Sequence, residues 1–199
     1  MQTRVEIADF ENWRAVAEDA AKVLRAGEVV ALPTETVYGL GADAFNAEAV
    51  AKVFEAKGRP SFDPLIVHIA GIRDLHRVAV VSEELEDVVR QLAKAFWPGP
   101  LTMVLPKHED IPDLVTSGLP TVAVRVSKHE VMRLLTKDLG PIAAPSANRF
   151  GRISPTSASA VLDELKGSIP LIVDGGACSN GLESTIIAVE VGEKRPVFR

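Results

Sequence analysis

The sequence predicts an α/β domain with a mixed sheet. Seven short apolar runs are interspersed with five longer segments in which apolar residues recur at helical spacing. The runs are unevenly spaced along the chain, which argues against a regular doubly wound pattern. A length of 199 residues, of which 47% are hydrophobic, is enough for a substantial core. We therefore expect a single domain over residues 1–199.

Five helices are expected, each with an apolar stripe along one face. Gly27 stands just past the end of the first, where glycine commonly ends a helix. The residues expected to cap the helices are Asp9, Asn46, Ser82 and a capping box at Ser127-Lys-His-Glu130. The expected helices cover residues 10–26, 46–57, 82–96 and 127–140, and a fifth starts at Thr156.

The seven expected strands cover residues 28–32, 65–69, 101–105, 121–126, 141–144, 169–173 and 184–190. The first ends at Pro33, which cannot donate a hydrogen bond to a sheet. It opens into the loop Pro33-Thr-Glu-Thr-Val-Tyr-Gly-Leu-Gly41, which combines hydroxyls, a carboxylate and two glycines. Glycine permits close approach of a backbone to a ligand, so we expect this stretch to be a binding loop.

Two polar side chains interrupt the expected strands. Arg125 alternates with the valines of residues 121–126, which places it on the opposite face from them. An arginine inside an apolar strand must reach solvent or meet an anion. His68 is set apart in the same way from its apolar neighbours, although a lone strand histidine is more often a satisfied core residue. Both side chains are expected to face a cleft.

Charge and cysteine content narrow the classes of function. The net charge of −5 and the pI near 5.4 argue against a general nucleic-acid coat. The single cysteine, Cys178, excludes an internal disulfide and a CxxC metal site and suits a reducing compartment. No apolar run approaches the ~20 residues of a membrane span, and residues 1–10 lack a signal-peptide core. We expect a cytoplasmic protein without a membrane partner.

None of the common nucleotide-binding, catalytic or metal-binding motifs explains the expected binding loop. Gly39-Leu-Gly-Ala-Asp-Ala44 matches the G-x-G-x-x-A pattern of dinucleotide-binding folds, with Asp63 about 20 residues further on. In that fold the first glycine directly follows the strand, whereas six residues separate Leu32 from Gly39 here. We reject this interpretation. No phosphate-loop, H-E-x-x-H, G-x-S-x-G or EF-hand pattern occurs in the chain.

Eight motifs occur in an order that resembles the YrdC-like threonylcarbamoyl-AMP synthases, the TsaC family. The resemblance covers nearly the whole chain and implies a YrdC-like domain, with a twisted mixed sheet flanked by helices and a concave cleft. The motifs are residues 33–41, Lys57-Gly-Arg-Pro60, Pro64-Leu-Ile-Val-His68, Trp97-Pro-Gly-Pro-Leu-Thr102, Val122-Ala-Val-Arg125, Ala144-Pro-Ser-Ala-Asn148, Asp174-Gly-Gly176 and Glu183-Ser-Thr185.

The resemblance implies a nucleotidyltransferase that combines L-threonine, bicarbonate and ATP into threonylcarbamoyl-AMP and pyrophosphate. Magnesium is expected to arrive with ATP, because no carboxylate cluster in the sequence forms a dedicated metal site. A tRNA-modifying threonylcarbamoyl transferase complex is the implied partner, and it would transfer the product to the adenosine beside the tRNA anticodon.

The resemblance also assigns site residues. The K-x-R and S-x-N signatures supply the implied catalytic residues Lys57, Arg59, Ser146 and Asn148. L-threonine would be held by Thr34, His68, Arg125 and Ser184, with Arg125 on its carboxylate. The implied ATP contacts are Arg59, Asp63, Ser146, Arg152 and Arg199.

Two features depart from the family pattern, and two other functions stay open. Asp63 stands where the family usually has Asn, and the sequence stops at Arg199 where relatives continue, as in a short natural form or a trimmed chain. An RNA-binding module with weak, electrostatic RNA binding is one alternative, and the acidic net charge counts against it. A carbamoyl-adenylate-handling relative of the hydrogenase-maturation carbamoyltransferases is the other, and the missing flanking domains count against it.

Overall fold

One sheet runs through the protein. The computed structural model describes residues 2–60, 63–191 and 196–198. The described residues form ten strands in the order β1-β8-β2-β3-β7-β4-β6-β5-β9-β10. Their bounds are β1 Arg4–Ile7, β2 Val30–Leu32, β3 Gly39–Asp43, β4 Ile66–His68, β5 Leu101–Pro106, β6 Thr121–Arg125, β7 Ile142–Ala143, β8 Leu171–Asp174, β9 Thr185–Val191 and β10 Pro196–Phe198.

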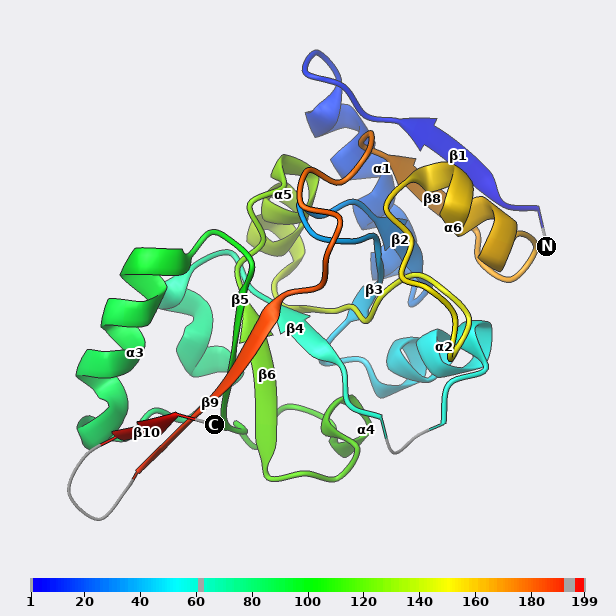
Figure 1. Ribbon diagram of the computed structural model, residues 1–199. Helices are drawn as coiled ribbons and strands as arrows, with labels where there is room; N and C mark the ends of the chain where they lie inside the picture. Colours follow the sequence, from blue (N-terminus) through cyan, green and yellow to red (C-terminus); the bar gives the residue numbers. More distant parts are fainter. Residues whose placement is uncertain (1, 61–62, 192–195, 199) are drawn as a thin grey trace.

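The sheet is mixed, as predicted. β8 pairs in parallel with both β1 and β2, and the pairs β4–β6 and β5–β9 are also parallel. The pairs β2–β3, β3–β7, β4–β7, β5–β6 and β9–β10 are antiparallel. Figure 1 shows the helices distributed around this twisted sheet, with α1 beside α5 and α3 beside the β9–β10 end. The predicted α/β class is confirmed.

Six α-helices and one 3₁₀-helix complete the described part of the chain. None of these helices has the length and apolar character needed to cross a membrane. Their bounds are α1 Trp13–Arg25, α2 Ala47–Lys57, α3 Glu83–Phe96, α4 Asp113–Thr116, α5 Glu130–Leu139 and α6 Ala158–Leu165, with the 3₁₀-helix at Ile72–Arg77.

The hydrophobic core lies on both faces of the sheet. Alternate residues of β2 point to opposite faces, so Ala31 joins one buried cluster while Val30 and Leu32 join the other. The larger cluster includes the buried faces of α2, α3 and α6, and the smaller one lies between the sheet and helices α1 and α5. The sheet is therefore covered on both faces around β2.

The seven expected strands are all present, but the sequence interpretation missed β1, β3 and β10. β3 begins in the stretch that we expected to be a binding loop, residues 33–41, and it forms an antiparallel hairpin with β2. A side chain would not fit at Gly41, because a Cβ there would lie 2.9 Å from Leu32 Cδ1. The connection between the two strands, residues 33–38, is the part of the expected loop that remains irregular.

Asn46 and Ser82 were predicted correctly as the N-caps of α2 and α3, although the Ser82 side chain makes no capping hydrogen bond, whereas the caps of α1 and α5 and the start of α6 were wrong. The Asn46 side chain accepts hydrogen bonds from two N–H groups in the first turn of α2. The N-cap of α1 is Asn12 rather than Asp9, and α6 begins after Ser157 rather than at Thr156. The capping box was also wrong. The N-cap of α5 is His129, whose Nδ1 accepts from Val131 N, while Ser127 binds a residue of the binding loop.

Candidate active site

A cavity of about 430 Å³ opens on the sheet where β3, β4 and β6 approach the loop after β2. Seven of the site residues expected from the resemblance line it: Thr34, Arg59, Asp63, His68, Arg125, Ser146 and Ser184. Lys57, Asn148 and Arg152 do not line the cavity. Arg199 lies outside the residues that the structure describes. The tertiary fold thus brings together residues from six separate motifs.

Arg125 lies at one end of the cavity and meets an anion. Its Nη1 donates to Thr36 Oγ1 at 2.8 Å, and its Nε donates to Gly99 O at 3.2 Å. Its Nη2 lies 2.7 Å from Glu35 Oε1 in an ion pair whose atoms are not aligned as a hydrogen bond. The arginine is 3% exposed, so of the two outcomes expected for it, solvent or an anion, the structure shows an anion, which comes from the binding loop.

Glu35 is held ionised behind Arg125. Its Oε2 accepts from Ser127 Oγ at 2.6 Å and from Lys128 N at 3.0 Å. Burial by itself raises the pKa of a carboxyl, but the Arg125 charge and the Ser127 hydrogen bond outweigh it, and the pKa of Glu35 is lowered below 4.5. The carboxylate is therefore charged at neutral pH.

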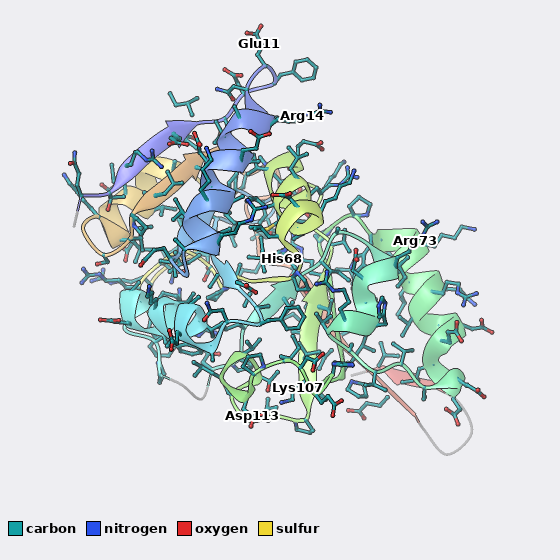
Figure 2. All side chains as sticks on the ribbon, turned by 180° about the vertical axis from the view of Figure 1, so that it is seen from behind. Glu11, Arg14, His68, Arg73, Lys107 and Asp113 are labelled. Carbon is teal, nitrogen blue, oxygen red and sulfur yellow. The ribbon has the colours of Figure 1, made fainter. Side chains whose placement is uncertain are left out.

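His68 ends β4 beside Arg125, because the two residues are register partners in the parallel pair β4–β6. Figure 2 shows His68 in the interior, whereas Arg14 and Arg73 project from the periphery. Burial, together with the Arg125 charge, lowers the pKa of His68 to about 3, so its imidazole is neutral at pH 7. Its Nδ1 has no hydrogen-bond partner among the described residues, which leaves one ring nitrogen for a ligand.

The hydroxyls in the cavity are engaged in different ways. Thr34 Oγ1 donates to Val37 O at 2.6 Å and accepts from the N–H of Thr36 at 3.1 Å, so it closes the turn of its own loop. Ser184 Oγ lies 2.7 Å from Thr102 Oγ1 on β5. The structure places the Ser184 pair at the cavity wall, while the Thr34 hydroxyl is already used to shape the loop.

Arg59 and Asp63 lie at the other end of the cavity. Arg59 Nη2 is 2.9 Å from Asp63 Oδ1, and Arg59 also donates to Asp63 O and Pro64 O. Asp63 precedes β4 and His68 ends it, so the cavity lining follows this segment from the Arg59–Asp63 pair to the Arg125–His68 pair. The cavity therefore offers a charged group at each of two places along β4.

Lys57 and Asn148 hold the loop that carries Ser146. Lys57 is 2% exposed, and its Nζ donates to the backbone carbonyls of Ser146 and Asn148. Asn148 Nδ2 donates to Arg149 O and Arg152 O, both at 2.8 Å. In the K-x-R signature, Arg59 lines the cavity and Lys57 binds the loop backbone. In the S-x-N signature, Ser146 lines the cavity and Asn148 binds the loop backbone.

The environment of Lys57 also changes its protonation. Burial, and then the neighbouring Arg59 charge, lower its pKa to about 7. Lys57 is the last residue of α2, where a cation complements the helix dipole, so this lysine also stabilises the end of the helix.

The side chain of Arg152 is exposed and is not part of the cavity lining.

The sequence interpretation missed four polar residues at or behind the cavity: Glu35, Thr36, Thr102 and Glu183. Glu35 was recognisable only as the one carboxylate in the binding loop, and no local pattern indicates that it pairs with Arg125 on a distant strand. In the part of the chain that the structure describes, no group of three or more His, Cys, Asp or Glu residues could hold a metal ion.

Comparisons with known proteins agree with this architecture. The Sua5/YciO/YrdC family model, described as "Telomere recombination", matches residues 22–199. The threonylcarbamoyl-AMP synthase of Pyrococcus abyssi is 51% identical over 179 residues, which are 89% of this chain and 51% of that protein. The Bacillus subtilis enzyme of the same name is 52% identical over 171 residues, or 85% of this chain and 49% of the relative.

A solved structure extends the likeness to three dimensions. P. abyssi Sua5 complexed with L-threonine has a TM-score of 0.88 and 46% identity, and the match covers 100% of this chain and 56% of that one. The chain therefore spans about half the length of the curated relatives it matches. The resemblance found from the eight motifs is confirmed at the level of the family.

Proposed function

Because the chain belongs to the Sua5/YciO/YrdC family, we propose that it joins L-threonine, bicarbonate and ATP into threonylcarbamoyl-AMP and releases pyrophosphate. The observation that carries the proposal is the cavity, which is lined by the buried Arg125, by a second arginine, Arg59, and by Ser146. The names of the relatives and the L-threonine complex of P. abyssi Sua5 support it. The reaction class is nucleotidyl transfer.

L-threonine would occupy the Arg125 end. A guanidinium in a water-poor site binds a carboxylate through charge-assisted hydrogen bonds, so Arg125 is the proposed partner of the substrate carboxylate. The neutral imidazole of His68 and the hydroxyl of Ser184 face the same space and would contact the remaining polar groups of the amino acid. Thr34 would act mainly through the shape of its loop, because its hydroxyl is bonded within that loop.

ATP would occupy the Arg59 end, with Mg²⁺ bound to its phosphates. As the carbamate oxygen attacks the α-phosphorus, charge grows on the phosphate oxygens and on departing pyrophosphate, and fixed donors stabilise it. Arg59 and Ser146 are the donors that line the cavity. Lys57 and Asn148 would keep Ser146 in place, and Arg152 and Arg199 are proposed as further nucleotide contacts. Asp63 would lie beside the phosphates, where it pairs with Arg59.

The product, a mixed anhydride of a carbamate and AMP, is reactive, and we propose that a tRNA-modifying transferase complex receives it in the cytoplasm. RNA binding by this chain itself would be weak and electrostatic, because the cavity cations are few and partly paired with carboxylates.

An omission assay tests the proposed reaction. Pyrophosphate release from ATP is expected only when L-threonine and bicarbonate are both present, since the carbamate must form before it can attack the phosphorus. The assay follows pyrophosphate with each component left out in turn. Equal release without L-threonine would refute the proposed function.

Asp63→Asn is expected to tighten ATP binding several-fold. Asp63 neutralises Arg59 in a partly exposed ion pair, so replacing the carboxylate by an amide returns one positive charge to the phosphate end. If screening reduces the electrostatic effect of this charge on ATP to ~1 kcal/mol, the affinity for ATP rises by a factor of about five. Calorimetric titration of Mg-ATP into both proteins measures it.

Asp113→Asn is the matched control, because Asp113 also pairs with a cation, Lys107, and neither residue lines the cavity (Figure 2). Unchanged ATP affinity in Asp63→Asn would mean that Asp63 does not repel the phosphates. Weaker binding would mean that Asp63 is itself a ligand, through Mg²⁺.

A further inference from the structure

The Arg125 end of the cavity carries a cation but no net charge. The side chains of Arg125 and Glu35 are 4% and 7% exposed, and their charged atoms lie 2.7 Å apart. Arg125 lines the cavity and Glu35 does not, so the pair presents its positive side to the ligand and its negative side to the protein. The pair is therefore a fixed dipole pointing out of the cavity wall.

The carboxylate of this dipole is fixed from several directions. Ser127 Oγ and Lys128 N donate to Glu35 Oε2 from the segment before α5. The Glu35 backbone carbonyl accepts from Asn180 N at 2.8 Å. All of these contacts are made by the protein itself, so Glu35 is fixed without help from a ligand and its charge acts on molecules that enter the cavity.

A buried arginine without a counter-charge would attract any small anion. In the proposed reaction the same cavity meets bicarbonate and the phosphates of ATP, which would compete for such a site. With Glu35 behind Arg125, a ligand that brings only a carboxylate is attracted by the guanidinium and repelled by the carboxylate. A zwitterionic amino acid also brings an ammonium group, which the Glu35 charge favours.

We propose that Glu35 is a specificity-determining residue that makes the Arg125 end select a zwitterionic amino acid over a simple anion. The inference rests on the proposed function, which places the substrate carboxylate on Arg125. Beside this ion pair, His68 Nδ1 is buried and has no hydrogen-bond partner among the described residues. A ligand that enters this end of the cavity can satisfy it, since buried polar groups are normally hydrogen-bonded.

Two ligands that differ only in the ammonium group test the inference. L-threonine and (R)-3-hydroxybutyrate share the carboxylate, the hydroxyl and the carbon chain, and the second lacks the amino group. Both are titrated by calorimetry into the unchanged protein, into Glu35→Gln and into Glu28→Gln. Glu28 pairs with Lys52 at the same 2.7 Å distance and does not line the cavity, so it provides the matched control.

Glu35→Gln is expected to bind (R)-3-hydroxybutyrate on the order of 10-fold more tightly, because the anion loses a repulsive neighbour. The affinity for L-threonine should change by less than about threefold, since its two charges feel opposite effects of the removed carboxylate. The preference for L-threonine should therefore fall roughly 10-fold in Glu35→Gln and stay unchanged in Glu28→Gln. An unaltered preference in Glu35→Gln would overturn the inference.

Two further measurements separate this inference from the proposed function and from misfolding. If the unchanged protein does not bind L-threonine, the proposed function fails. The role of Glu35 is then decided by inorganic phosphate and (R)-3-hydroxybutyrate, whose binding must still tighten in Glu35→Gln. If Glu35→Gln does not fold, the unchanged protein decides: comparable affinity for the two organic ligands, or displacement of L-threonine by phosphate, would refute selection by Glu35.

Discussion

Lys57→Met is expected to lower turnover on the order of 100-fold and to destabilise the protein, although Lys57 does not line the cavity. The Lys57 ammonium donates to two backbone carbonyls of the loop that carries Ser146. Methionine fills the same space but leaves both carbonyls without a donor, and each unsatisfied buried group costs about 1–3 kcal/mol. The loop should then shift, and Ser146 with it.

Turnover is measured by pyrophosphate release at saturating substrate, and stability by denaturant unfolding. Lys52→Met is the control, because Lys52 also donates to a backbone carbonyl, that of Gly27, but lies away from the cavity. Full turnover in Lys57→Met would show that the loop does not depend on this lysine.

The same variant tests how the stability of the protein depends on pH through Lys57. The pKa of Lys57 is about 7 in the folded protein and 10.5 for an unperturbed lysine, so the unfolded chain binds more protons between these values. Stability should therefore rise with pH across this window in the unchanged protein. The difference in unfolding free energy between the unchanged protein and Lys57→Met should grow from about pH 7 to about pH 10. A difference independent of pH would contradict the lowered pKa.

Arg125→Met is expected to destabilise the protein by about 3–5 kcal/mol, because it leaves the Glu35 carboxylate buried without a counter-charge. Arg125 also donates to Thr36 and Gly99, so the binding loop and the segment after α3 would lose contacts as well. L-threonine affinity should fall by about 2–3 kcal/mol, or roughly 30- to 150-fold, through loss of the charge-assisted contact to its carboxylate.

The double variant Arg125→Met/Glu35→Gln separates the two effects. Removing both charges should restore most of the stability, since no buried charge is left unpaired. It should not restore L-threonine affinity, because the guanidinium is still missing. Denaturant unfolding and calorimetry on the two variants measure this. A stable Arg125→Met that binds L-threonine normally would remove Arg125 from both proposed roles.

The sequence by itself determined the fold class and the family. Apolar periodicity located all seven expected strands and five helices, because burial on a sheet or along a helix face imposes a local repeat. Asn46 was identified as a cap for the same reason, since a cap binds N–H groups within its own first turn. Strand alternation also placed Arg125 on the face opposite its valines, and the structure has the arginine in the cavity wall.

Only the tertiary structure decided which residues share the cavity and what each one contacts. Ser127 looked like a helix cap because its neighbours fit a local pattern, but its hydroxyl donates to Glu35, far away in the chain. Lys57 looked like a cavity cation, and instead it binds carbonyls of a loop that follows another strand. The two glycines of the binding loop belong to β3, whose pairing depends on β7 as well as β2. Such contacts join segments distant in sequence, so no local pattern records them, and they exist only when the sheet has assembled.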